Sequence, residues 1–112
     1  MQEILEAINS LCGWDCLIKS FDGWSLCISS GTSPEYSLPL VVFSGVSYLS
    51  CPIEFSHPKF RVANEHEQEK IGKIVPIERE DFVFVIEAET MASLERNLLF
   101  LVAQSVVLAT NV

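Results

Sequence analysis

The stretch Phe82-Val83-Phe84-Val85-Ile86-Glu87-Ala88 carries the clearest secondary-structure signal in the chain. Its side chains alternate between two faces, and one face is made of four apolar residues: Phe82, Phe84, Ile86 and Ala88. A period of two residues is typical of a β-strand with one buried face. Glu87 and Glu89 fall on the opposite face. We therefore predict a strand over 82–88 whose two glutamates point into water.

The segment that follows this strand permits two interpretations. Residues 90–109 could form a helix, because leucine, alanine and glutamine favour helices. Alternatively, residues 89–97 form a loop and residues 98–108 form a strand that pairs back onto residues 82–88. The aromatic and β-branched residues of the segment, such as Phe100 and Val106, favour the second interpretation. We predict the strand.

Residues 15–29 have the pattern of a β-hairpin. Asp22-Gly23 separates two β-rich runs, and this dipeptide favours a type I′ turn because both of its residues need a positive φ. A two-residue loop would set two cross-strand pairs facing the core: Phe21 with Trp24 and Leu17 with Ile28. Lys19 falls on the same face. Either this register is wrong or the pair lies at an edge, where the lysine can extend its ammonium group into water.

The N-terminal segment, residues 2–12, has the 3.6-residue period of an amphipathic helix. Its apolar face is formed by Ile4, Leu5, Ile8 and Leu11. Glu3 and Glu6 lie in the first turn, where the helix dipole favours negative charge. Gly13 is a suitable residue for ending the helix.

The middle of the chain is expected to form short strands separated by turns. A strand over 38–43 is followed by Ser44-Gly45, which is either a two-residue turn or a bulge in a strand that continues to Ser50. We favour the bulge because glycine inside a strand often marks one. The polar run 64–70 is expected to be a solvated loop or one helical turn. Three further short strands are predicted, the last at a sheet edge because of Pro76: 53–56, 60–63 and 74–77.

Together these elements predict an α+β fold in a single domain spanning residues 1–112. The N-terminal helix would pack on a curved, mostly antiparallel β-sheet or on a partly open barrel.

The composition limits the partners of the chain. Its 15 acidic and 7 basic residues give a formal net charge of −8. Phosphate backbones and anionic lipids need a basic surface, so we expect neither a nucleic-acid nor a membrane partner. The negative charge lies mainly at the two ends of the chain, because residues 51–80 hold six acidic and five basic residues.

Nothing at the N-terminus has the form of a signal peptide. The longest nearly uncharged apolar run, residues 98–109, is shorter than the roughly 20 residues of a membrane-spanning helix. We therefore expect a cytoplasmic protein. Four cysteines lie among apolar neighbours and are expected to be reduced and structural: Cys12, Cys16, Cys27 and Cys51.

No set of residues with catalytic spacing emerges from the sequence. His57 could pair with Cys51, but a histidine in a turn is the favoured interpretation. The acidic run from Glu65 to Glu69 could hold a weakly bound divalent cation, yet a solvated charged segment is favoured. We expect no catalytic residues, no metal and no cofactor.

An acidic face beside exposed aromatic residues is suited to binding a basic protein. The candidate binding residues are Trp14, Asp15, Tyr36, Glu87 and Glu89. We therefore expect a non-enzymatic protein-binding or inhibitory module. One alternative is a homodimeric structural subunit that uses the edge strand at Pro76. A second is a small-ligand binder with a pocket near Cys51 and His57.

Three segments resemble a known group of proteins. Residues 42–49 have the form Phe-x-Gly-Val-x-Tyr-Leu, and the segments 82–89 and 100–106 follow downstream. Together they resemble the small, acidic, β-rich bacterial domains associated with the immunity proteins of toxin systems, over about half of the chain. The Phe-His-Asp signature of such domains is here Phe21-Asp22, without the histidine. The resemblance implies a non-enzymatic inhibitor that binds a partner protein, and it supports a C-terminal strand.

Overall fold

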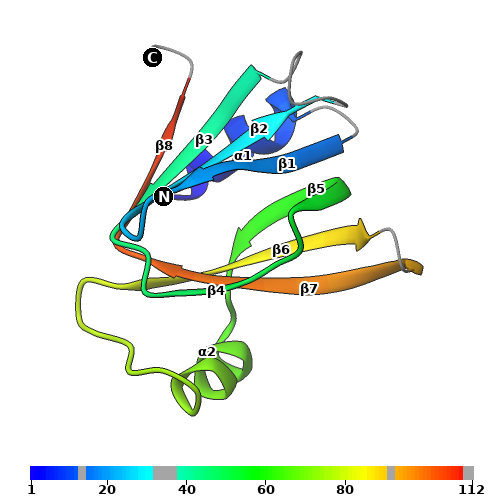
Figure 1. Ribbon diagram of the computed structural model, residues 1–112. Helices are drawn as coiled ribbons and strands as arrows, with labels where there is room; N and C mark the ends of the chain where they lie inside the picture. The colour runs from blue at the N-terminus through cyan, green and yellow to red at the C-terminus, as the bar shows by residue number, and fades with distance from the viewer. Residues whose placement is uncertain (13–14, 32–37, 91–92, 110–112) are drawn as a thin grey trace.

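The computed structural model describes residues 1–12, 15–31, 38–90 and 93–109. Within these ranges the chain forms two helices and eight strands (Figure 1). In chain order they are α1 (Gln2–Leu11), β1 (Asp15–Phe21), β2 (Ser25–Ser30), β3 (Leu38–Ser44), β4 (Tyr48–Ser50), β5 (Glu54–Val62), α2 (Glu65–Gly72), β6 (Phe82–Thr90), β7 (Ser93–Ala103) and β8 (Ser105–Leu108).

The described strands form one antiparallel sheet in the order β4-β7-β6-β5-β1-β2-β3-β8. The sheet is bent so that β8, β3, β2 and β1 form one layer and β5, β6, β7 and β4 form the other (Figure 1). The two strands at the ends of this order continue from inner strands, because β4 follows β3 and β8 follows β7. The predicted α+β fold with a curved antiparallel sheet is confirmed.

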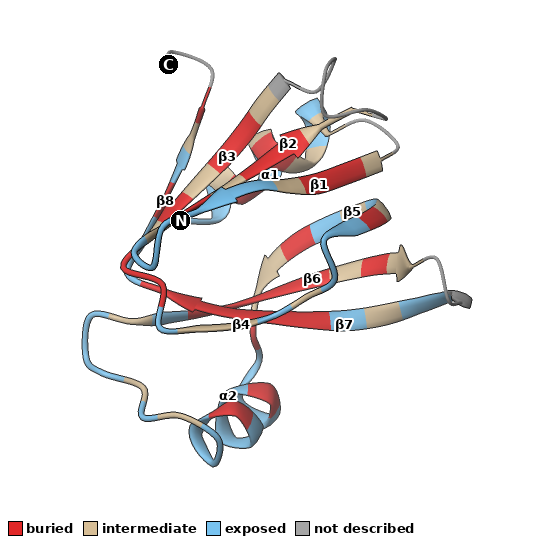
Figure 2. Ribbon diagram, viewed as in Figure 1, coloured by how far each residue is buried: buried red, intermediate tan, exposed pale blue. Residues whose placement is uncertain are grey.

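The main core takes its residues from strands of both layers, and Figure 2 shows buried residues along the strands of each layer. Its largest fully buried side chains are Phe43, Phe55, Phe60 and Phe84. Helix α1 contributes Leu5 and Ile8, which are buried in the same core. The predicted N-terminal helix therefore packs on the sheet through its apolar face.

The hairpin of β1 and β2 is confirmed, but the predicted register is wrong. Ile18 pairs with Ile28 and Phe21 with Leu26, and the register shifts at Lys19. The Asp22 carboxylate accepts hydrogen bonds from the backbone N–H groups of Trp24 and Ser25, at 2.9 and 2.7 Å. The N–H of Asp22 also donates to the Ser25 carbonyl at 3.3 Å, so the turn closes between Asp22 and Ser25, one residue later than predicted. As a result Phe21 and Trp24 are exposed, and the bulge turns Lys19 into solvent.

The bulge predicted at Ser44-Gly45 is also wrong. Strand β3 pairs with β2 and β8, whereas β4 pairs with β7 in the other layer. The chain therefore crosses between layers at this point. Gly45 has a φ of +70°, a conformation that residues with a Cβ rarely adopt. A Cβ atom at Gly45 would lie 2.8 Å from the side chain of Gln104, which marks the corresponding break between β7 and β8.

Replacing Gly45 with alanine is expected to cost more stability than replacing Gly23. Both glycines have a positive φ, so each substitution carries a backbone cost of about 1 to 2 kcal/mol. A Cβ at Gly23 meets nothing within 4 Å, whereas a Cβ at Gly45 would also collide with Gln104. Urea unfolding of Gly45→Ala and Gly23→Ala measures the difference, which we expect to be at least about 1 kcal/mol. Equal losses would contradict the close approach of the two strand breaks.

The two short strands predicted over 53–56 and 60–63 are one strand, β5, with an irregularity between Ser56 and Lys59. Residues 74–77, which the structure describes, do not form the predicted strand. The backbone N–H groups of Ile74 and Val75 instead turn back to the carbonyl of Ile71, at 2.9 and 3.0 Å. The chain therefore coils at the end of α2, and no edge strand forms at Pro76.

The polar run 64–70 forms most of helix α2 and is not a solvated loop. Asn64 caps the helix by accepting from the N–H of Glu67, and the Glu67 carboxylate accepts from the N–H of Asn64, both at 2.9 Å. This reciprocal pair is a capping box. Ile71 then anchors the helix in a second apolar cluster with residues of the sheet: Ala63, Val83, Val85, Phe100 and Val102.

Residues 98–108 lie in strands as predicted, but they form two strands: β7 pairs with β6, whereas β8 pairs with β3 in the other layer. The loop predicted over 89–97 is wrong, because β6 continues to Thr90 and β7 begins at Ser93. The prediction of one buried face on residues 82–88 is wrong in part. Phe82 is exposed, whereas Val83 and Val85, on the face expected to meet water, are buried under α2. Helix α2 covers this second face, and that is why both faces of the strand are apolar.

Candidate functional site

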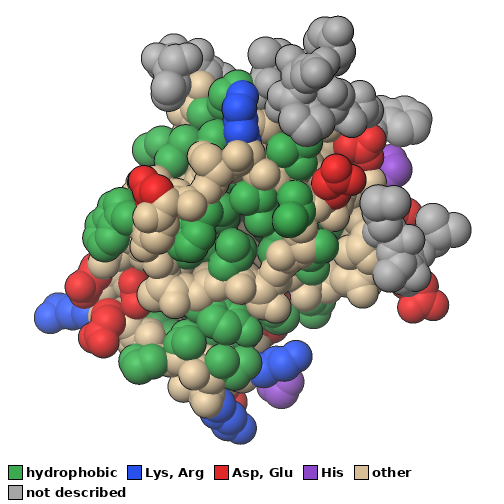
Figure 3. Space-filling model, viewed as in Figure 1, with side chains coloured by type: hydrophobic (Ala, Val, Ile, Leu, Met, Phe, Trp, Pro, Cys, Tyr) green, Lys and Arg blue, Asp and Glu red, His purple; other side chains and the backbone are tan. Residues whose placement is uncertain are grey.

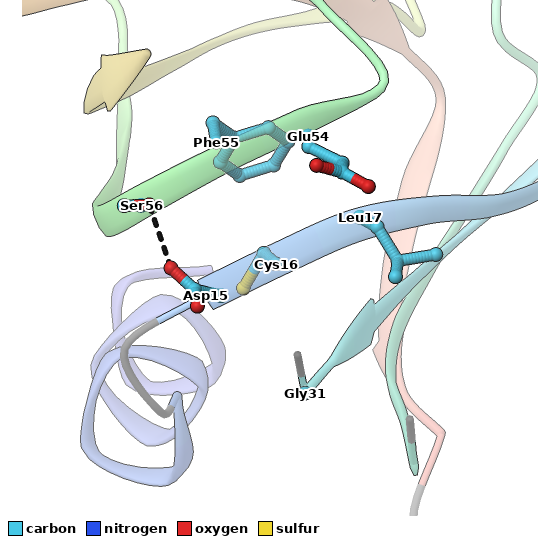
Figure 4. A pocket seen from close by; sticks show the side chains of 7 residues that line it. All are labelled: Asp15, Cys16, Leu17, Gly31, Glu54, Phe55 and Ser56. Carbon is cyan, nitrogen blue, oxygen red and sulfur yellow. Dashed lines mark hydrogen bonds between the residues drawn. The ribbon is translucent and has the colours of Figure 1, made fainter. Parts of the chain in front are cut away.

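A hollow of about 170 Å³ lies where the two layers meet along β1 and β5. Only a short ladder joins these strands in the described chain, from Asp15 opposite Ser56 to Leu17 opposite Glu54. Figure 4 shows the lining side chains on the two strands, with Gly31 at the end of β2 closing one side. The lining residues are Asp15, Cys16, Leu17, Gly31, Glu54, Phe55 and Ser56.

The polar part of the lining is acidic. The Ser56 hydroxyl donates to Oδ1 of Asp15 at 2.6 Å, which fixes the carboxylate at the edge of the hollow. The N–H of Gly31 donates to the Asp15 carbonyl at 3.0 Å, which holds the backbone there. Glu54 supplies a second, exposed carboxylate. The described residues that line the hollow include no lysine or arginine. The arrangement therefore favours a cation.

Acidic side chains continue from the hollow across the sheet. Asp15 pairs with Ser56 and Ser56 with Glu89, so the three residues lie side by side on adjacent strands. On the face shown in Figure 3, acidic side chains gather near the ends of β1 and β5. The Glu89 carboxylate contacts Nδ1 of His57. The strand ends beside the hollow therefore carry a further carboxylate, which contacts a histidine.

Glu87 and Glu89 do not simply point into water as predicted. Glu87 accepts from Nε of Arg61 at 2.9 Å, and the side chains of both glutamates are only 29% exposed. Arg96 donates to the carbonyls of His57 and Glu87, at 2.9 and 2.5 Å. These contacts hold the irregular part of β5 against β6. Glu87 is thus part of an internal ion pair, and Asp15 is the predicted binding residue that lies on the hollow.

Trp14 and Tyr36, the two aromatic residues predicted for binding, lie outside the described residues. Cys51 and His57 flank the segment that lines the hollow, but neither is a lining residue. The Cys51 thiol donates to the Pro52 carbonyl at 3.1 Å, and burial raises the pKa of Cys51 to about 12. His57 contacts Glu89 instead. The structure therefore does not bring the two residues together as a nucleophile and its base.

The described residues contain no group of three or more histidine, cysteine, aspartate or glutamate side chains that could hold a metal ion. The acidic run from Glu65 to Glu69 is divided, because Glu67 is buried against Arg61 with contacts of 2.7 and 2.8 Å. Neither described helix is long and apolar enough to cross a membrane. What the site offers chemically is a small anionic hollow.

Sequence reasoning missed Glu54, Ser56 and Gly31 as neighbours of Asp15. No local signal could have identified them, because the pairing of β1 with β5 joins residues about forty positions apart. Comparison with protein-family models, curated protein sequences and solved structures finds no match for this chain. The resemblance to immunity proteins therefore stays a prediction that rests on its sequence motifs.

Proposed function

We propose that this protein is a non-enzymatic binding module that docks on a basic segment of a partner protein. In this proposal the hollow between β1 and β5 receives one lysine or arginine side chain, which pairs with Asp15 and Glu54. The observation that carries the proposal is the pair of carboxylates among described lining residues that include no lysine or arginine. The net charge of −8 supports it, because a negative field speeds the approach of a basic partner.

The size of the hollow favours a side chain over a larger ligand. Pockets for cofactors and drug-sized molecules have volumes of roughly 300 to 1,000 Å³. The hollow is smaller, at about 170 Å³, and suits the end of one amino-acid side chain. A guanidinium group would suit the site well, because it can bind two carboxylates through separate N–H groups.

More specifically, we propose that the protein is an inhibitor of the immunity type, which acts on a basic bacterial protein in the cytoplasm. The free thiols of the cysteines are in keeping with a reducing compartment. The homodimer alternative loses the edge strand at Pro76 on which it depended. The small-ligand alternative would now use the hollow lined by Cys16 and Ser56, in place of a pocket at Cys51 and His57.

Selection from a displayed library of random short peptides tests the proposal. We expect the selected peptides to be enriched in lysine or arginine. Their affinity, measured by calorimetry, should fall at least about tenfold in the double variant Asp15→Asn, Glu54→Gln, because charge-assisted hydrogen bonds are lost. The amide oxygen that replaces the Asp15 carboxylate can still accept the bond from Ser56, so the strand pairing is preserved.

The matched control is the double variant Glu3→Gln, Glu80→Gln, which removes the same charge from two exposed positions away from the hollow. We expect its affinity to stay within about twofold of the original chain at physiological salt, where exposed charges are screened. Selected peptides without basic enrichment, or equal losses in both double variants, would contradict the proposal.

A further inference from the structure

Two cysteines meet at the junction of α1 and β1. Cys12 directly follows α1, and its backbone N–H donates to the Ile8 carbonyl at 2.9 Å. Cys16 lies in β1 and is paired with Ser30 on one side and Phe55 on the other. The two Sγ atoms are 3.2 Å apart. Because both backbones are held by hydrogen bonds, the fold itself brings the thiols into contact.

The two thiols differ in access and in acidity. Cys16 is 1% exposed, whereas Cys12 is only partly buried. A hydrogen bond joins the two sulfurs, and this bond lowers the pKa of Cys12. The same bond, together with burial, raises the pKa of Cys16. Cys12 is therefore the accessible sulfur that is more readily ionised, which is the property of an attacking cysteine.

We propose that Cys12 and Cys16 form a reversible dithiol–disulfide site that reacts with low-molecular-weight disulfides. The Cys12 thiolate attacks one sulfur of the small disulfide, whose S–S bond breaks and releases one thiolate. The Cys16 sulfur then attacks Cys12 Sγ, displaces the second small thiol and passes its proton to that leaving group. The protein dithiol loses two electrons and two protons, and the small disulfide is reduced to two thiols.

The geometry favours the second step. A disulfide bond is about 2.05 Å long, so the two sulfurs must approach by only about 1 Å from their present separation. Modification of Cys12 also changes its hydrogen bond with Cys16, the contact that contributes most to the raised pKa of Cys16.

Cys51 is a third thiol that could form a disulfide with Cys16, so the test must distinguish its oxidation from that of Cys12. Its charge acts on Cys16, so it lies in the same neighbourhood. Burial raises the pKa of Cys51 to about 12, which makes it a poor nucleophile at neutral pH. Cys27 lies on β2 and serves as a control.

The probe is glutathione disulfide, in buffers of graded ratio to glutathione, followed by trapping of the remaining thiols with a maleimide and mass spectrometry. Trypsin cleaves after lysine and arginine, so it releases Cys12 and Cys16 together in peptide 1–19 and Cys27 and Cys51 together in peptide 20–59. We expect peptide 1–19 of the oxidised chain to carry no maleimide and to be lighter than the reduced peptide by the mass of two hydrogens. Peptide 20–59 should carry two maleimides. Added dithiothreitol should restore full labelling.

Variants assign the two roles. Cys16→Ser is expected to stop at the mixed disulfide of Cys12 with glutathione, whereas Cys12→Ser should react with glutathione disulfide at least about tenfold more slowly. Cys27→Ser should behave as the original chain does. Circular dichroism verifies that each variant is folded. Four results would each overturn the proposal. They are a cross-link between the two peptides, an oxidised pair within peptide 20–59, a mixed disulfide that persists in the original chain, and full labelling of peptide 1–19 under oxidising conditions.

Discussion

Replacing Phe43 with alanine is expected to lower the free energy of unfolding by about 3 to 5 kcal/mol. Phe43 is fully buried between the layers, and its ring centroid lies 5.0 Å from that of Phe84 and 6.4 Å from that of Phe60. The Phe84 contact is edge-on, at 63°, a favourable arrangement for aromatic rings. Truncation would leave a cavity where the two layers are held together. Guanidinium unfolding followed by far-ultraviolet circular dichroism measures the loss.

Phe82→Ala is the matched control for this substitution. It removes the same side chain from the same sheet, and Phe82 also contacts Phe84, with ring centroids 6.1 Å apart. Phe82 is 41% exposed, however, so we expect a loss of less than about 1.5 kcal/mol. The more conservative Phe43→Leu should fall between the two alanine variants. If Phe43→Ala cost no more than Phe82→Ala, the assignment of the main core to the space between the layers would be wrong.

Elements that depend on neighbouring residues could be predicted from the sequence. The 3.6-residue period identified α1, and Asp22-Gly23 identified the hairpin. The strand conformation of 98–108 followed from the β-branched and aromatic residues near the C-terminus, although only its first part, in β7, pairs with 82–88. The register of the hairpin could not be predicted, because it depends on which backbone groups the Asp22 carboxylate binds.

Features that depend on distant residues were predicted poorly. Ser44-Gly45 has the same local pattern whether it forms a bulge or carries the chain into the other layer. The crossing depends on pairing with strands β7 and β8, and the N–H of Gln104, about sixty residues away, donates to the Ser44 carbonyl at 2.9 Å. Helix α2 was predicted only as a solvated loop or one helical turn, because its polar residues hide a capping box and one buried apolar anchor, Ile71. The hollow depends on β1 meeting β5, so only Asp15 of its lining could be identified in advance, and by its charge alone.

Replacing Arg61 with methionine is expected to lower the free energy of unfolding at pH 7 by about 3 kcal/mol. The guanidinium group makes two hydrogen bonds to the Glu67 carboxylate, at 2.7 and 2.8 Å, and one to Glu87 at 2.9 Å. Glu67 is 7% exposed, so without Arg61 its charge would be buried with no cation beside it. The double variant Arg61→Met, Glu67→Gln should recover part of the loss, because the neutral amide can still cap α2 at the N–H of Asn64. Equal stability of the single and double variants would show that leaving the Glu67 charge without a cation costs no stability.

The pH dependence gives the same prediction an independent test. The hydrogen bonds from Arg61 lower the pKa of Glu67 to about 2 in the folded chain, against about 4.3 for an unfolded glutamate. The unfolded chain therefore takes up this proton first as the pH falls. The stabilisation from the ionised Glu67 is fully present above about pH 4.3 and is lost as the pH falls towards 2. In Arg61→Met the cause of the low pKa is removed, so the difference in stability between this variant and the original chain should narrow from pH 7 to pH 3. A difference that stayed constant over this range would mean that Arg61 stabilises the chain by the packing of its side chain and not by its charge.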